Sequence, residues 1–319
     1  MSLVTMKEIL KDAEKKQYAV GMFNTINLEM VRAIIGAAEA EKSPVILGMA
    51  EVHMAYGDLK MLAPIMVKAA KEAKVPVAVH FDHGVTFHNI VMSMHLGFTS
   101  VMYDGSTLSY EENIQGTKEI VKIAKVLGVT VESELGHVGG AEGGGDDGHE
   151  SQYTDVNQAL DFVERTGIDA LAVAIGTAHG VYKHKPKLDL NRLLEIHQKV
   201  NVPLVLHGGS GLSDQDFENC IYNGIRKINI FTDMSEAAIS RIKNEVNGLV
   251  QISQKAYGSM NEQKQHELLV EEITKKVLAQ SQPASNATVQ YPDLVNATVE
   301  GIKEEIIKKM RLFGSSGRA

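Results

Sequence analysis

The 319-residue sequence contains one cysteine, Cys220, and no long apolar run. A single cysteine cannot form an intramolecular disulfide, and this scarcity is typical of proteins from reducing compartments. No apolar stretch approaches the roughly 20 residues that a membrane-spanning helix needs. The segment Met1–Val20 also lacks the basic start, apolar middle and small-residue cleavage site of a signal peptide. We therefore expect a cytoplasmic protein.

The chain has fewer basic than acidic residues. The chain has 32 Lys and Arg against 40 Asp and Glu, and its formal net charge is −8. This balance does not attract nucleic acid or an anionic membrane, and it favours a small-molecule partner. The apolar content of 44% and charged content of 23% are typical of a soluble globular protein. An anionic substrate must therefore be attracted by a local field.

Eight short apolar runs alternate with segments of helical periodicity. The runs are too short for helices and largely continuous, which is typical of strands buried on both faces. The predicted strands are Ala19–Phe23, Val45–Met49, Val77–Phe81, Ser100–Tyr103, Thr130–Leu135, Ala170–Ile175, Leu204–His207 and Lys227–Ile230. Between them lie helix signals such as the capping box of Ser213 and Asp216. Eight alternations predict a closed (β/α)8 barrel, an α/β TIM barrel. An open doubly wound sheet is the alternative, but no GxGxxG follows the first strand.

The strand pattern stops at Asp233 and gives way to polar, helical sequence. We expect helices over Asp233–Gln280 and Pro292–Leu312, joined by an exposed loop at Gln280–Gln290. The chain, 1–319, is interpreted as one barrel domain, with residues 233–319 as a helical C-terminal extension. The glycine-dense stretch Gly139–Gly148 follows the fifth strand and predicts a mobile loop over the barrel mouth.

Three histidines stand at the ends of different predicted strands: His83, His179 and His207. Barrel enzymes build their active sites at the C-terminal ends of the strands, so closure of the barrel would bring these side chains together. Three imidazoles leave one coordination position open, as a catalytic zinc site requires. The sequence therefore predicts one divalent metal ion, with zinc as the first choice. We interpret His80, within its strand, as a residue that contacts the metal ligands without binding the metal itself. The remaining histidines are interpreted as surface residues: His53, His88, His95, His149, His184, His197 and His266.

Glycines and carboxylates occupy the same strand ends. The glycines after His207 allow backbone N–H groups to approach an anion closely, although a plain tight turn would also use them. Asn229 and Thr232 end the eighth strand, where barrels usually hold phosphate. Asp82, beside His83, fits either an orienting partner or a proton-transfer group. Glu132 and Glu134 lie on the same face of their strand. Glu142 lies in the glycine loop, and taken by itself this position indicates a charge exposed to solvent.

Together these motifs resemble those of the class II, metal-dependent ketose-bisphosphate aldolases, a family that includes fructose-bisphosphate and tagatose-bisphosphate aldolases. The resemblance runs from about Tyr18 to Asp233 and returns at Phe313–Gly317. The motifs that carry it are Phe23-Asn24, Asp82-His83, Glu134-Leu135-Gly136, the glycine loop with Glu142, His179–Lys183, His207–Leu212 and Asn229–Thr232.

The resemblance implies an aldolase that reversibly cleaves a ketose 1,6-bisphosphate into dihydroxyacetone phosphate and glyceraldehyde 3-phosphate. Fructose 1,6-bisphosphate is the default substrate. Zinc on the three histidines would polarise the ketone, with Glu134 as an alternative ligand or a group near the metal. Asp82 would shuttle a proton to and from the C4 oxygen, and Glu142 would take the proton from the carbon of dihydroxyacetone phosphate.

The resemblance also implies further binding residues and partners. The substrate and phosphate set is Asn24, Gly180, Lys183, Gly208, Ser210, Asn229 and Thr232. Arg311 is expected to bind the second phosphate, from the same subunit or across a dimer interface. A monovalent cation, Na⁺ or K⁺, is expected nearby, and the protein is expected to be a homodimer or larger homo-oligomer.

Two positions depart from the family pattern and bear on the substrate. Phe231 stands where fructose-bisphosphate enzymes commonly carry Asp or Asn and tagatose enzymes carry Ala, and Ala50 replaces a common Ser or Thr. Tagatose bisphosphate or another phosphoketose is therefore an alternative substrate. A non-catalytic sugar-phosphate-binding protein is the alternative of another class, but it would not need both Asp82 and Glu142.

Two other enzyme classes fit less well. A Schiff-base aldolase needs a lysine at the C-terminal end of a strand, whereas Lys227 is at the other end of its strand and Lys183 is in a loop. The commonest metal-dependent hydrolase of this fold uses an HxH pair on the first strand, and Gly21–Asn24 has none. We therefore expect a metal-dependent aldolase.

Overall fold

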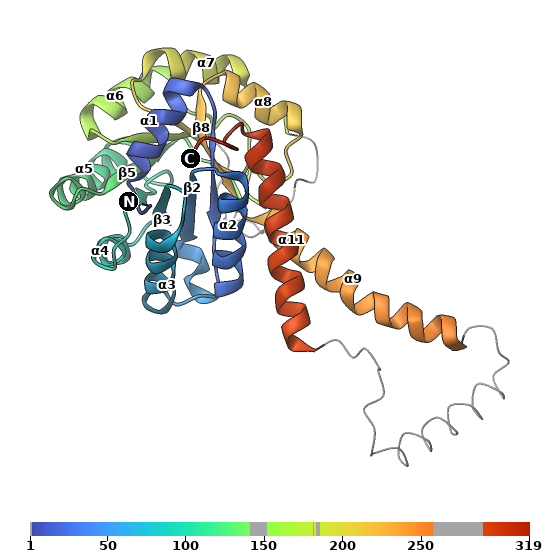
Figure 1. The fold of residues 1–319 in the computed structure, drawn as a ribbon. Helices are drawn as coiled ribbons and strands as arrows, with labels where there is room; N and C mark the ends of the chain where they lie inside the picture. Colours follow the sequence, from blue (N-terminus) through green and yellow to red (C-terminus); the bar gives the residue numbers. More distant parts are fainter. Residues whose placement is uncertain (1, 141–151, 181, 183–185, 258–289) are drawn as a thin grey trace.

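The computed structural model describes residues 2–140, 152–180, 182, 186–257 and 290–319 (Figure 1). Eight parallel strands pair in sequence order, and β8 closes onto β1, so the sheet is a complete barrel. The strands are β1 (Val20–Asn24), β2 (Val45–Ala50), β3 (Val77–Gly84), β4 (Ser100–Tyr103), β5 (Thr130–Leu135), β6 (Ala170–Val173), β7 (Leu204–Leu206) and β8 (Ile225–Ile230). Closure confirms the predicted (β/α)8 barrel and excludes the open sheet.

Helices connect the strands and cover the outside of the barrel (Figure 1). They are α2 (Leu28–Glu41), η1 (Glu51–Ala55), α3 (Leu59–Glu72), α4 (Phe87–His95), α5 (Tyr110–Leu127), α6 (Val156–Thr166), α7 (Leu190–Lys199) and α8 (Asp214–Tyr222). The predicted capping box of α8 is confirmed, since Ser213 Oγ accepts from the backbone N–H of Asp216 while the Asp216 carboxylate accepts from Ser213. Such caps satisfy the free N–H groups of a first turn and start each helix at a definite residue.

Helix α1 (Met6–Lys16) precedes the first strand and was missing from the sequence prediction. Its available signal was the capping box formed by Thr5 and Glu8. The buried face of α1, with Met6, Ile9 and others, packs against apolar residues inside the N-terminal end of the barrel, among them Val20, Met22, Ile46, Ala78, Met102, Ala170, Ala172 and Val205. Among the described residues, this packing closes the N-terminal end of the barrel.

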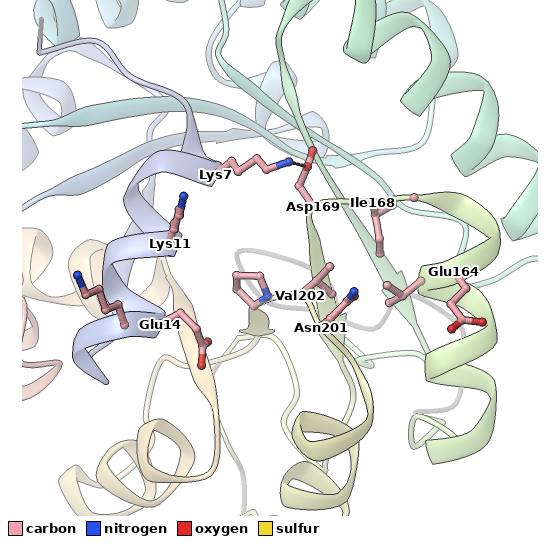
Figure 2. A pocket seen from close by; sticks show the side chains of 12 residues that line it. Lys7, Lys11, Glu14, Glu164, Ile168, Asp169, Asn201 and Val202 are labelled. Carbon is pink, nitrogen blue, oxygen red and sulfur yellow. Dashed lines mark hydrogen bonds and ion pairs between the residues drawn. The ribbon is translucent and has the colours of Figure 1, made fainter.

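A cleft of about 580 Å³ lies outside this closed end, between α1 and the starts of β6 and β7 (Figure 2). Figure 2 shows Lys7 and Lys11 on one side, and Lys7 is bound to Asp169 at 2.8 Å. Apolar side chains such as Ile168 and Val202 line the other side. The cleft lies at the opposite end of the strands from the predicted histidines.

The extension begins with α9 (Thr232–Tyr257), which starts directly after β8 and projects away from the barrel (Figure 1). Helix α11 (Tyr291–Leu312) returns beside α9 and packs against α2. The rest of the predicted 233–280 helix and of its following loop lies outside the described residues, except for Gln290. The same is true of residues 141–148 in the glycine loop. Within the described part of the chain, no helix has the length and apolar character to cross a membrane.

Candidate functional site

The three predicted metal ligands meet at the mouth of the barrel. His83 is the penultimate residue of β3, His179 lies in the loop after β6, and His207 directly follows β7. One nitrogen from each ring lies within 4.8 Å of the others. The Nε2 atom of His83 is 2.8 Å from Nδ1 of His207. Three converging imidazole nitrogens are a donor set suited to zinc.

Carboxylates hold the outer nitrogens of two of these rings. Nδ1 of His83 donates to Asp104 Oδ2 at 2.8 Å, and Nε2 of His207 donates to Glu132 Oε1 at 2.9 Å. Such outer partners orient an imidazole and direct its other nitrogen to the metal position. Sequence reasoning missed Asp104, although it stands directly after β4, where the same strand-end argument would have found it.

A buried ion pair lies beneath His207. Nζ of Lys227 is 2.8 Å from Glu132 Oε2, and both side chains are fully buried. Burial would raise the pKa of Glu132, but the positive charge of Lys227 lowers that pKa to about 2. Lys227 lies in the first half of β8, as the sequence indicated, and its long side chain reaches the carboxylate that pairs with His207. Its paired ammonium is not a free amine for a Schiff base.

Asp82 lies at the centre of a polar network inside the barrel. It accepts hydrogen bonds from the side-chain amides of Asn24 at 2.8 Å and Asn229 at 3.1 Å. Nε2 of His80 is 3.5 Å from Asp82, while Nδ1 of His80 pairs with Ser100. Burial alone would raise the pKa of Asp82, but the neighbouring charge of His83 holds it well below its usual range. This direction favours an ionised carboxylate at Asp82, next to the predicted metal ligands.

Glu134 occupies the other side of the histidine cluster. Its Oε1 accepts from the backbone N–H of Val138 at 2.9 Å, and its Oε2 is 3.8 Å from Nδ1 of His207. Together with His83 and Asp104 it forms a second group of potential ligand atoms within 4.8 Å. Burial raises the pKa of Glu134 well above its usual range. This position suits a carboxyl group that binds near the metal or replaces a ligand.

The loop after β7, which contains Gly208, Gly209 and Ser210, forms a cradle next to the histidines. A side chain at Gly208 is impossible, because its φ is +64° and a Cβ atom would lie 2.4 Å from the carbonyl oxygen of Ala178. Ser210 Oγ accepts from the backbone N–H groups of Phe231 and Asp233, both at 3.3 Å. A small pocket is lined by His179, Gly180, Gly208, Gly209, Ser210, Asn229, Phe231 and Thr232. Because Thr232 begins α9, the positive end of that helix dipole faces this pocket, which favours an anion.

His53 was predicted at the surface, and the structure shows that this was wrong. Helix η1 turns the side chain inward, where it is only 1% exposed. Its ring lies against Phe231, with centroids 4.1 Å apart and planes tilted by 34°. His88 and His95 are exposed, as predicted, and His197 is partly buried. The other predicted surface histidines, His149, His184 and His266, lie outside the described residues.

Arg311 is not brought to this site within the chain. Its guanidinium binds the carboxylate of Glu41, with distances of 2.7 and 3.1 Å. Glu41 is the last residue of α2, which runs opposite to the strands, so the pair lies at the closed, N-terminal end of the barrel. Glu142 and Lys183, the remaining predicted site residues, lie outside the described residues.

Comparisons with known proteins agree with this arrangement. The family described as "Fructose-bisphosphate aldolase class-II" matches residues 4–318. A "Probable fructose-bisphosphate aldolase" from Bacillus subtilis is 41% identical and covers 100% of both chains. A "Fructose-bisphosphate aldolase" from Geobacillus stearothermophilus is 40% identical over 100% of this chain and 99% of its own. The crystal structure of the YdjI aldolase from Escherichia coli K12 superimposes with a TM-score of 0.77 at 35% identity, covering 99% of both chains.

Proposed function

Because this chain belongs to the class II fructose-bisphosphate aldolase family, whose members are lyases, we propose that it is a zinc-dependent aldolase. The proposed reaction is the reversible cleavage of a ketose 1,6-bisphosphate into dihydroxyacetone phosphate and glyceraldehyde 3-phosphate. Fructose 1,6-bisphosphate is the default substrate. One observation carries the proposal: His83, His179 and His207 converge beside the ionised carboxylate of Asp82 at the open end of the barrel.

The donor set fits a single divalent metal ion. The imidazole nitrogens come from β3, from the loop after β6 and from the residue after β7, and carboxylates orient two of the three rings. Three protein ligands leave a position for substrate, which distinguishes a catalytic zinc site from a structural one. When bound there, zinc would act as a Lewis acid on the ketone oxygen.

The chain's own residues supply binding and proton transfer. The cradle formed by Gly208, Ser210 and the start of α9 at Thr232 would hold the phosphate of the three-carbon fragment. In the cleavage direction Asp82 accepts the proton of the C4 hydroxyl and the C3–C4 bond breaks. The electron pair stays with the three-carbon fragment, and Glu142 then delivers a proton to that carbon. The amides of Asn24 and Asn229 keep Asp82 in its ionised form, which is the form that can accept a proton.

A different sugar is the second candidate, and Phe231 is the observation that favours it. Its ring packs on the buried ring of His53 and lines the same pocket as the cradle. An apolar surface there cannot accept a hydrogen bond from a sugar hydroxyl, unlike the Asp or Asn of the family pattern. Tagatose bisphosphate or another phosphoketose is thus the alternative substrate.

The same proposal includes finer features that follow from the family resemblance. They are a monovalent cation, Na⁺ or K⁺, near the phosphate, a homo-oligomeric assembly and a glycolytic role. A cytoplasmic location is proposed on the single thiol, which is buried in α8.

The test is an assay of purified protein against fructose and tagatose bisphosphates, with triose phosphates detected by a coupled dehydrogenase. Chelation should abolish cleavage, and added zinc or cobalt should restore it. Activity that survives chelation, or that is trapped by borohydride, would refute the metal mechanism. Metal binding without cleavage of any phosphoketose would favour the non-catalytic binding protein.

A further inference from the structure

The hydroxyl of Tyr182 lies between two loops of the site, and neither the sequence motifs nor the proposed chemistry assigns it a role. It accepts a hydrogen bond from the backbone N–H of Ala178 at 3.0 Å. It donates one to the backbone carbonyl of Gly208 at 2.7 Å. The loop after β6 is thereby joined to the loop after β7 through a single oxygen atom.

Both partners of this hydroxyl adjoin metal-ligating residues. Ala178 directly precedes His179, and Gly208 directly follows His207. Gly208 is also the first residue of the anion cradle. One side chain therefore connects the backbone of two ligands with the backbone that would bind phosphate.

The surroundings of Tyr182 leave its hydroxyl little freedom. The two loops are in close contact, since a Cβ atom at Gly208 would lie 2.4 Å from the carbonyl oxygen of Ala178. A Cβ atom at Gly211, in the loop after β7, would lie 3.1 Å from the ring of Tyr182. Burial raises the pKa of Tyr182 to about 12. The hydroxyl thus remains protonated at neutral pH and can donate to Gly208.

We propose that Tyr182 is a positioning residue that couples the anion cradle to the metal site, so that each site binds its ligand more tightly when the other is filled. An anion in the cradle fixes Gly208, and the hydroxyl bridge transmits this restraint to Ala178 and His179. A metal ion that fixes His179 and His207 restrains the cradle in return. This reciprocity is required of any such coupling. The inference rests on the proposed function, because it needs both a metal and a phosphate site.

The experiment measures the affinity for inorganic phosphate by calorimetry, on metal-free and on Co²⁺-loaded protein. Tyr182→Phe removes the hydroxyl and keeps the ring. Tyr110→Phe is the matched control, because Tyr110 also makes two hydrogen bonds, to Asp161 and to the backbone of Gln158, but on the outer surface between α5 and α6. The titrations are made in about 0.5 M salt, which screens the direct attraction between metal and phosphate charges. Thermal unfolding of both variants checks that they are folded.

We expect cobalt to raise the phosphate affinity of the parent protein and of Tyr110→Phe by about 5-fold or more, within the usual range of coupled sites. In Tyr182→Phe the enhancement should fall to less than about 2-fold. A folded Tyr182→Phe with the parent enhancement would overturn the inference while leaving the proposed function intact, and so would a parent protein whose two sites bind independently. A parent protein that binds no cobalt or no phosphate would instead overturn the proposed function.

Discussion

Replacing Lys227 by methionine tests the buried ion pair beneath the proposed metal site. The ammonium of Lys227 lies 2.8 Å from Glu132, and neither side chain is exposed to solvent. Methionine has a similar length and is apolar, so it fills the space but leaves the carboxylate without its cation. Breaking a buried pair in this way typically costs about 3–5 kcal/mol, because the remaining charge is desolvated and unpaired.

The structure places the expected cost at the lower end of that range. Glu132 keeps one hydrogen bond, from Nε2 of His207 at 2.9 Å, after Lys227 is removed. We therefore expect Lys227→Met to lower the free energy of unfolding by about 3 kcal/mol. Adding Glu132→Gln should recover at least about 1 kcal/mol, because an amide is neutral and can still pair with His207.

A surface pair of the same length provides the control. Lys7 and Asp169 are also 2.8 Å apart, but the Lys7 side chain is 69% exposed. Lys7→Met should therefore cost about 1 kcal/mol or less. Urea unfolding of the metal-free proteins, followed by circular dichroism, gives all three values by linear extrapolation.

Glu132→Ala, in contrast, removes the carboxylate that orients His207 and should weaken metal binding. Loss of such an outer partner typically reduces metal affinity by about 10–100-fold. Two results would refute the reasoning: Lys227→Met as stable as Lys7→Met, or a double variant less stable than Lys227→Met. Either result would mean that the ammonium of Lys227 does not stabilise the buried carboxylate of Glu132.

Further predictions address the site and the thiol. His179→Ala should lose most of its zinc, measured by metal analysis. Asp82→Ala should keep zinc but cleave its substrate about 10²–10⁴-fold more slowly, because it lacks a proton-transfer group. Glu142→Ala should severely slow the exchange of a dihydroxyacetone phosphate proton with solvent, followed by NMR, whereas Asp82→Ala should affect this exchange much less; parent-rate exchange in Glu142→Ala would place the base elsewhere. Burial raises the pKa of Cys220 to about 12. Its reaction with iodoacetamide should therefore be slow at pH 8, rise with pH beyond 9, and become fast only on unfolding; rapid alkylation of the native protein at pH 8 would contradict this.

The sequence by itself determined the barrel and which three histidines lie together at its mouth. Strands buried on both faces have a distinct local pattern of continuous apolar residues, and helix caps such as Ser213 with Asp216 act within a few residues. Parallel closure then places every strand end at one rim, so position along the chain was enough to bring His83, His179 and His207 together.

Tertiary structure alone decided what long or flexible side chains contact. The reach of Lys227 to Glu132 depends on the width of the barrel interior, which no local pattern encodes. The inward turn of His53 onto Phe231 depends on the short helix η1. Arg311 binds Glu41 because α11 packs against α2. The bridge made by Tyr182 exists only because the loops after β6 and β7 pack together, and the contacts between neighbouring loops are set by the folded barrel rather than by either loop sequence.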